Sequence, residues 1–333
     1  MELKMVGNAH IVGLIRKMIT KNKEQRSIMI HGETGLGKKH LAHYIAAAYL
    51  CEEHNGEPCG KCKSCLMAMH EAHPDIINVQ ANANGNYIID ESIRPIVSDS
   101  VVMPNESRYK VYIIPDLDRS VNTVTAVQNI LLKLIEEPPE HVVVIMTARS
   151  KEIFLPTIIS RTLSLAVTSV TEQECLEYLR GAFPDKTEQE LADAVSAGRG
   201  NIGRCTAFLQ GSGFADNAEK ARALCDAVTS GDEYLMLRAM AGISSNKQNA
   251  RAVLELLSEI CADASLLHVG QTDTTAFVSC YEQGARKLAE VISAQGGVQL
   301  YDILCEHINR IDANCNLALT LNSLAARLSQ AVK

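Results

Sequence analysis

The nine residues from His31 to Lys39, HGETGLGKK, constrain the fold more than any other part of this 333-residue sequence. They follow the apolar run Ile28–Ile30 and precede a helical pattern over Leu41–Ala48. A strand, a glycine-rich turn and a helix in this order form a phosphate-binding P-loop, in which backbone N–H groups and the helix N-terminus face an anion. The motif assigns this degenerate nucleotide-binding site to Gly32, Gly35, Gly37, Lys38 and Lys39.

Two positions of this site lack the residues that hold Mg²⁺ in a P-loop ATPase. The residue after the P-loop lysine should be Ser or Thr, but here it is Lys39, whose ammonium group cannot coordinate a cation. The apolar strand over residues 110–114 should end in an Asp, but Pro115 stands there and is followed by Asp116. The sequence therefore predicts a P-loop without ATP hydrolysis, and it leaves open whether nucleotide still binds.

Buried strands alternate with helices up to about residue 165. The strand over residues 110–114 is followed by a second one over residues 142–146, and a shorter strand is expected over residues 76–79. Between them we expect a turn-rich insert at Asn82–Asn86 and a helix starting within Ile88–Ile96, with Asp90 as N-cap. Past Thr171 the pattern is helical throughout, which predicts a parallel α/β domain followed by helical domains.

The chain has 11 cysteines, and four of them have the spacing Cys51-x7-Cys59-x2-Cys62-x2-Cys65. Four thiolates on a polar, glycine-rich loop fit a tetrahedral structural Zn²⁺ site. The alternatives are a redox dithiol, an iron–sulfur cluster or unliganded core cysteines, and His54 or His70 could replace one ligand. The other cysteines are expected in the core: Cys175, Cys205, Cys225, Cys261, Cys280, Cys305 and Cys315.

Composition narrows the classes of function. The net charge is −7, Trp is absent and aromatic residues make up 4% of the sequence, which argues against broad nucleic-acid binding by this chain alone. No apolar run is long enough to span a bilayer, the N-terminus lacks a signal-peptide pattern, and scattered unpaired cysteines are typical of a reducing compartment. We therefore expect a cytoplasmic protein.

Further motifs follow the P-loop and the cysteines in a fixed order. They are His73-Pro74-Asp75, the run from Ala126 to Lys133 leading into Glu136-Glu137-Pro138-Pro139, Thr147-Ala148-Arg149, and Ser160-Arg161-Thr162. The ordered set, over roughly residues 1–210, resembles the clamp-loader branch of the AAA+ ATPases. Hydrolysing subunits of that family carry the Thr and the Asp-Glu that are missing here, so the similarity is to the subunits with an eroded ATP site.

The resemblance implies three domains. Residues 1–167 would form an AAA+ ATPase-like α/β domain with a parallel sheet and a zinc module at residues 51–65. Residues 168–210 would form a small helical lid, and residues 211–333 an all-α collar that joins an oligomer.

The resemblance also implies a function. The chain would be a non-catalytic stator of the DNA polymerase III clamp loader, part of a DNA-directed DNA polymerase holoenzyme, without ATPase activity of its own. Ser160 and Arg161 match the motif that sends an arginine finger into a neighbouring subunit's ATP site, with Thr162 replacing the family's cysteine. The lid arginine that senses nucleotide would fall near Gly203, with Arg204 one place along, so we expect no direct sensor.

The implied partners are gamma/tau-like ATPase subunits and the delta subunit. The sliding clamp and primed DNA would be reached through the complex, with no membrane contact. Two other functions stay open: a catalytically active, gamma/tau-like ATPase motor with unusual ligands, and a stand-alone zinc-dependent nucleic-acid binder. Lys39 and Pro115 separate the first from the stator, and the acidic composition argues against the second.

Overall fold

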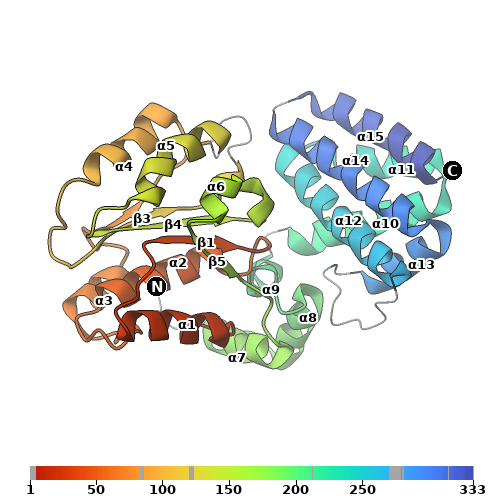
Figure 1. Cartoon of the computed structure of the whole chain (residues 1–333). Coiled ribbons are helices and arrows are strands. Elements are labelled where there is room, and N and C mark those ends of the chain that lie inside the picture. The colour runs from red at the N-terminus through yellow and green to blue at the C-terminus, as the bar shows by residue number, and fades with distance from the viewer. Residues whose placement is uncertain are drawn as a thin grey trace. The chain divides into compact units, whose positions relative to one another are not determined.

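The computed structural model describes residues 5–82, 86–119, 124–211, 213–269, 279, 281–313 and 315–332. The chain divides into two compact units, each with its own hydrophobic core (Figure 1). Unit 1 comprises Met1–Lys186 and Gly200–Gly203, and unit 2 comprises Thr187–Arg199 and Arg204–Lys333. The three-part division at residues 167 and 210 stays a prediction.

Unit 1 contains a five-stranded, wholly parallel sheet with the strand order β2-β3-β4-β1-β5. The strands are β1 (Ser27–His31), β2 (Ile76–Asn78), β3 (Lys110–Ile114), β4 (Val142–Ala148) and β5 (Leu163–Ala166). The first four confirm the predicted strands, whereas β5 was not predicted. Its sequence, Leu-Ser-Leu-Ala, alternates and is short, and only pairing with β1 defines it as a strand.

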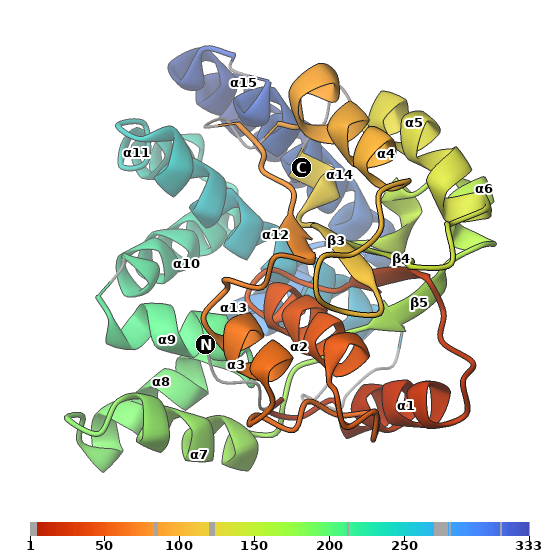
Figure 2. The same ribbon diagram turned by 90° about the vertical axis from the view of Figure 1, so that its left-hand side faces the viewer.

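Helices cover both faces of the sheet (Figures 1 and 2). One face carries α1 (Ala9–Thr20), α2 (Lys38–Leu50) and α3 (Lys63–Met69), and the other carries α4 (Arg94–Asp99), α5 (Val124–Glu136) and α6 (Pro156–Ile159). Successive strand residues point to opposite faces, so Val111 and Ile113 pack with α1 and α2, whereas Tyr112 and Ile114 pack with α4–α6. This three-layer arrangement confirms the predicted fold class.

The segment before α4 differs from the prediction. A π-helix, η1 (Ile89–Ile93), precedes α4, and its N-cap is Ile88 rather than Asp90. Asp90 lies in the first turn and pairs with Arg94 at 2.5 Å. A carboxylate can stabilise a helix start from the first turn as well as from the cap position, which explains the misplacement. The insert at Asn82–Asn86 is described only at its ends, and residues 83–85 lie outside the described residues.

Asp75 fixes the loop that leads into β3. Its side chain is fully buried, and its carboxylate accepts the backbone N–H groups of Asn105, Glu106 and Ser107 at 2.6–2.9 Å. His73 lies beside it and contacts the Ser107 hydroxyl at 3.1 Å. The His73-Pro74-Asp75 motif therefore has a structural role here, in joining the start of β2 to the loop before β3.

The remaining described elements are mainly helical. Unit 1 also has two 3₁₀ turns, η2 (Leu117–Arg119) and η3 (Lys151–Ile153), and helix α7 (Glu172–Ala182). In unit 2 lie α8 (Glu188–Gly198), α10 (Phe214–Ser230), α11 (Glu233–Ala241), α12 (Lys247–His268), α13 (Glu282–Val291), α14 (Ala294–Asp312) and α15 (Leu317–Val332), while α9 (Ile202–Leu209) spans the boundary. Thr171 and Thr187 begin α7 and α8 with capping boxes to Glu174 and Glu190.

Helix α12 is the centre of unit 2 and packs against α10, α13 and α14. The scattered cysteines that are buried, as predicted, are Cys175, Cys205, Cys225 and Cys261. Cys305 is half-buried. Cys315 is exposed because it lies in the turn between α14 and α15, so the prediction that it lies in the core is wrong. Cys280 lies outside the described residues. In the described part of the chain, no helix is both long enough and apolar enough to cross a membrane.

Candidate functional site

The predicted P-loop connects β1 to α2 at the edge of the sheet where the parallel strands end. Gly37 precedes α2 in a left-handed conformation with φ 83°. Gly35 has φ 93°, and a Cβ atom there would lie only 2.3 Å from Asn201 Oδ1. Glycine is needed at this position both for the backbone conformation and for the close approach of Asn201. The local fold is therefore that of the predicted loop.

Lys38 is turned back onto its own loop. Its side chain is 6% exposed, and its ammonium nitrogen donates to the carbonyl oxygens of Gly32 and Glu33, both at 2.7 Å. Lys39 is exposed. Lys38 thus begins α2 with its ammonium group on loop carbonyls, and Lys39 offers no hydroxyl at the position of the metal ligand.

Two residues from a distant part of unit 1 close over the P-loop. The Asn201 side-chain amide donates to the Thr34 carbonyl at 2.9 Å, and the Gly203 N–H donates to the Gly35 carbonyl at 3.0 Å. Asn201 is 3% exposed, so this contact is buried. The sequence marked this segment only as a glycine-rich break, because no local pattern indicates a contact with a loop 167 positions earlier.

Arg204, the neighbour of the expected sensor position, pairs with Glu259 inside unit 2. Its guanidinium group is therefore engaged by a carboxylate of its own unit. The expectation that this position holds no direct nucleotide sensor stays a prediction.

The ends of β3 and β4 lie at the same edge of the sheet as the P-loop. Pro115 follows β3, and the next residue, Asp116, has φ 47° and donates its N–H to the Thr147 hydroxyl at 2.8 Å. Asp118 pairs with Arg149 at 3.4 Å. Pro115 supplies no metal ligand directly after β3, and the Asp118 carboxylate is already paired with Arg149.

The four cysteines of the predicted metal site come together in unit 1. Cys51 directly follows α2, and Cys62 is the N-cap of α3. The four Sγ atoms all lie within 4.8 Å of one another, and those of Cys59 and Cys65 are 4.0 Å apart. Tetrahedral Zn–S bonds of about 2.3 Å would place sulfurs roughly 3.8 Å apart. The described residues of this cluster include neither His54 nor His70.

Backbone N–H groups surround the cysteine sulfurs. The N–H of Cys59 donates to Cys51 Sγ at 3.4 Å, that of Cys62 to Cys59 Sγ at 3.3 Å, and that of Cys65 to Cys62 Sγ at 3.4 Å. The N–H groups of Lys61 and Cys62 lower the pKa of the Cys59 thiol to about 7, whereas burial raises the pKa of Cys51 and Cys65. Sulfurs that accept amide hydrogen bonds fit a thiolate-bound metal ion.

The cysteine segment is fastened to the rest of unit 1 on two sides. Gly56 approaches α1 so closely that a Cβ atom would lie 2.7 Å from Arg16 Cα, and Glu57 pairs with Arg16 at 3.2 Å. Lys63, at the start of α3, pairs with Glu106 at 2.7 Å. The cluster thus connects α1, α2 and the loop before β3.

The predicted arginine finger, Arg161, lies just after α6. Its side chain is 44% exposed, and its Nη1 donates to the Thr157 carbonyl at 3.1 Å and contacts the Ser160 hydroxyl at 3.4 Å. Its Nε lies 3.3 Å from a carboxylate oxygen of Glu136. Ser160 also donates its hydroxyl to the Thr157 carbonyl at 3.0 Å. Sequence reasoning selected Ser160 and Arg161 but missed Glu136 as their neighbour.

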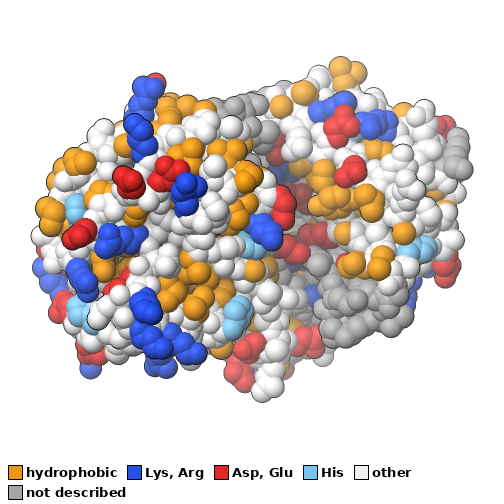
Figure 3. Space-filling model, viewed as in Figure 1, with side chains coloured by type: hydrophobic (Ala, Val, Ile, Leu, Met, Phe, Trp, Pro, Cys, Tyr) orange, Lys and Arg blue, Asp and Glu red, His pale blue; other side chains and the backbone are white. Residues whose placement is uncertain are grey.

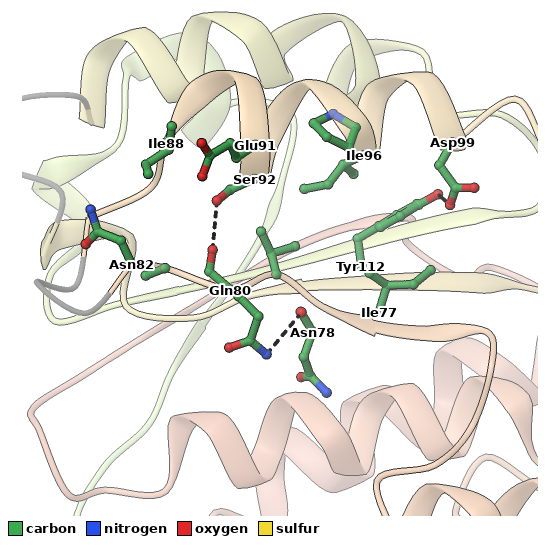
Figure 4. Close-up of a pocket in the computed structure, with 13 residues that line it drawn as sticks. Ile77, Asn78, Gln80, Asn82, Ile88, Glu91, Ser92, Ile96, Asp99 and Tyr112 are labelled. Carbon is green, nitrogen blue, oxygen red and sulfur yellow. Dashed lines mark hydrogen bonds between the residues drawn. The ribbon is translucent and has the colours of Figure 1, made fainter.

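A pocket of about 510 Å³ lies elsewhere in unit 1, beside β2 and the η1–α4 segment (Figure 4). Its lining is mainly apolar, with Asp99 and Tyr112 hydrogen-bonded to each other at 2.7 Å at one end. It contains none of the predicted site residues. The predicted functional residues therefore form three groups: the P-loop, the cysteine cluster and Arg161.

Comparison with known proteins relates the first half of the chain to replication proteins. Residues 7–171 match the family described as "DNA polymerase III, delta subunit". The gamma/tau subunit of DNA polymerase III from Mycobacterium tuberculosis is 31% identical over 160 residues, which cover 48% of this chain and 27% of that protein. The delta' subunit from Escherichia coli is 26% identical over 250 residues, 75% of this chain and 72% of that protein.

The chain thus spans about a quarter of the length of the gamma/tau relatives that it matches. Among solved structures, a DNA polymerase III gamma subunit-related protein of Thermotoga maritima aligns with 97% of this chain and 99% of its own, at 18% identity and a TM-score of 0.43. A similarity this low carries no functional argument. The sequence comparisons show similarity to DNA polymerase III subunits, over residues 7–171 for the family model and over 160 and 250 residues for the two relatives.

Proposed function

We propose that this chain is a delta-prime subunit of the bacterial DNA polymerase III clamp loader. It would act as a non-catalytic stator, with gamma/tau-like ATPase subunits and the delta subunit as partners, during loading of the sliding clamp on primed DNA. The match to the Escherichia coli delta' subunit, which extends over 75% of this chain, supports the proposal. The location would be the cytoplasm.

The closed P-loop is the observation that carries the non-catalytic role. Lys38 is hydrogen-bonded to the carbonyls of its own loop, Asn201 covers Gly35, and Lys39 and Pro115 occupy the positions of the metal ligands. A metal-dependent phosphoryl transfer needs both Mg²⁺ ligands and an open cradle. Several independent features therefore oppose ATP hydrolysis by this chain.

The exposure of Arg161 supports an action in trans. In phosphoryl transfer, negative charge spreads over the γ-phosphate oxygens, and an arginine from a neighbouring subunit stabilises the transition state. The Arg161 side chain is 44% exposed on unit 1, and it has no role in its own P-loop if that loop holds no nucleotide. Its target would be ATP bound by the adjacent subunit.

One observation favours the alternative of an ATP-hydrolysing, gamma/tau-like motor. Identity to the gamma/tau relative is 31%, against 26% for the delta' relative. The match to the gamma/tau relative covers only 48% of this chain, however, and the chain itself carries Lys39 and Pro115 where a motor needs its metal ligands. A stand-alone nucleic-acid binder is less well supported, since Lys and Arg side chains on the visible face of unit 1 are interspersed with acidic and apolar ones (Figure 3).

For the cysteine cluster we propose a structural Zn²⁺ ion held by Cys51, Cys59, Cys62 and Cys65. Four protein ligands would fill a tetrahedral site and leave no open position for substrate. The role would be to hold the segment between α2 and α3 against α1 and the loop before β3, in line with the Arg16–Glu57 and Lys63–Glu106 ion pairs.

The test is ATP hydrolysis by the isolated chain and by a reconstituted loader. The isolated chain should show no turnover, and Arg161→Ala and Arg161→Lys should both reduce DNA- and clamp-stimulated hydrolysis by the loader without preventing assembly. The loss should be partial, because other subunits supply arginines of their own. Turnover by the isolated chain that is lost in Lys38→Ala would establish a motor instead. A mutant loader that assembles and hydrolyses ATP at the wild-type rate would contradict the role of Arg161.

A further inference from the structure

The guanidinium group of Arg161 is held on two of its three nitrogens by its own chain. Nε faces the Glu136 carboxylate at 3.3 Å, and Nη1 donates to the Thr157 carbonyl at 3.1 Å. Among the described residues, Nη2 has no hydrogen-bond partner. Because the five N–H donors of a guanidinium form a rigid planar fork, fixing two nitrogens also fixes where Nη2 points.

Glu136 stands where helix stability alone would not favour a carboxylate. It is the last residue of α5, and the C-terminal end of a helix carries a partial negative charge that disfavours Asp and Glu. Its described ion-pair partner is Arg161, and its side chain is 39% exposed. Its neighbour Glu137 is also exposed and forms no ion pair within the described residues. Of the two adjacent glutamates, Glu136 is thus the one that engages the predicted finger.

The ion pair leaves the phosphate-binding end of the guanidinium available. Glu136 contacts Nε, at the base of the fork, so a phosphate oxygen can reach Nη2 without displacing the carboxylate. Arginine side chains are flexible, and binding through one that is already ordered loses less conformational entropy. An arrangement that fixes Nε and Nη1 while Nη2 stays open therefore suits an arginine that must bind an anion in a defined direction.

We propose that Glu136 is a positioning residue for Arg161, which orients the finger toward the phosphate of a neighbouring subunit's ATP. The inference rests on the proposed function and adds a residue to it. Glu136 would touch neither ATP nor the reacting atoms, and its contribution would pass entirely through Arg161. It follows that Glu136 should matter only when Arg161 is present.

The test uses the reconstituted loader with six forms of this chain: wild type, Glu136→Gln, Glu136→Asp, Glu137→Gln, Arg161→Ala and the double variant Glu136→Gln/Arg161→Ala. Stimulated ATP hydrolysis is measured over a range of ATP concentrations. Glu136→Gln should lower kcat for the Arg161-dependent part of hydrolysis about two- to fivefold, the range expected for one exposed ion pair, with KM unchanged. Glu137→Gln should behave as wild type, and Glu136→Asp should restore part of the loss.

The double variant separates positioning from a general structural effect. If Glu136 acts through Arg161, the double variant hydrolyses ATP at the rate of Arg161→Ala alone. A lower rate in the double variant than in Arg161→Ala would overturn the inference, and so would an unchanged kcat in Glu136→Gln. A raised kcat in Glu136→Gln would also overturn it, because it would show that Glu136 restrains Arg161. If Arg161→Ala itself has no effect, the proposed function fails as well. Size-exclusion chromatography of each complex confirms equal assembly.

Discussion

Single residues decide several local features of this protein, and Asp75 is the strongest case. Its buried carboxylate accepts four hydrogen bonds, three from backbone N–H groups and one from the Asn105 side chain. Burial opposes its ionisation, but the backbone donors outweigh this and hold the pKa of Asp75 below its usual range. The Asp75 carboxylate thus supplies the hydrogen-bond acceptors that these loop N–H groups would otherwise find in regular secondary structure.

Asp75→Asn should destabilise unit 1 by about 1–3 kcal/mol, because an amide cannot accept all of these hydrogen bonds and leaves buried N–H groups unpaired. Urea denaturation would measure the loss, with the exposed Asp185→Asn, also in unit 1, as control. The wild-type pKa is lowered in the folded state, so the contribution of Asp75 is complete above the unfolded pKa of about 4 and disappears as the pH falls through the folded pKa. If Asp75→Asn costs as much stability at pH 3 as at pH 7, this assignment is wrong.

The roles of some single residues could be predicted from the sequence, whereas the roles of others could not. Lys39 and Pro115 stand at fixed offsets from a motif, so the missing metal ligands could be predicted without a structure. Glu136 and Asn201 could not, because each gains its role from a side chain or loop that only the tertiary fold brings near. A short motif identifies residues that are close in the sequence. Contacts such as those of Glu136 and Asn201 depend on how distant segments pack, which a motif does not show.

At the scale of elements, the segment between α2 and α3 is held by the cysteine cluster and, more weakly, by its contacts with α1 and the loop before β3. It contains the tight turns at Gly56 and Gly60 but no strand, and its few salt bridges involve exposed side chains. Exposed ion pairs contribute at most about 1 kcal/mol each. We therefore expect the order of this segment to depend on a bound metal ion.

Purified protein should contain about one Zn²⁺ per chain, as determined by elemental analysis. Cys62→Ser should lower the melting temperature of unit 1 by at least about 5 °C, the shift for a loss near 2 kcal/mol, without abolishing partner binding. The exposed Cys315→Ser serves as the matched control. Metal-free protein with an unchanged melting temperature would exclude a structural metal site.

The P-loop element offers a second prediction. Wild-type protein should bind ATP or inorganic phosphate weakly, because Lys38 is occupied by loop carbonyls and Asn201 covers Gly35. Removing the Asn201–Thr34 hydrogen bond in Asn201→Ala should tighten binding of a fluorescent ATP analogue roughly two- to tenfold, with Asn249→Ala as control. Turnover should require Lys39→Thr and Pro115→Asp together. Tight ATP binding by the wild type would show that the closure opens easily.

Element boundaries were predicted best where one face or both faces of an element are buried. β3 and β4 read directly as continuous apolar runs, because both of their faces pack against helices. β5 did not, since the alternation of an edge strand is not distinctive when it extends over only four residues. The cysteine cluster was fully predictable, because ligand spacing is a local property of the chain.

On the scale of the whole molecule, the two units have separate cores and separate chemistry. The cysteine cluster and both cores of the sheet lie in unit 1, whereas unit 2 is built on the core around α12. Calorimetry should therefore resolve two unfolding transitions, and a zinc chelator should lower only the one that belongs to unit 1. Equal shifts of both transitions would show that the units unfold together.

The position of β1 in the sheet has a consequence during synthesis. β1 lies between β4 and β5, and both of these partners are translated much later than β1 itself. At about 5–20 residues per second, the apolar strand stays unpaired for several seconds after it leaves the ribosome. Parallel pairing between distant segments is slow to form and exposes strand edges to aggregation meanwhile. The nascent chain should thus depend most on a chaperone before β5 emerges, when β1 has been synthesised but one of its edges is still unpaired.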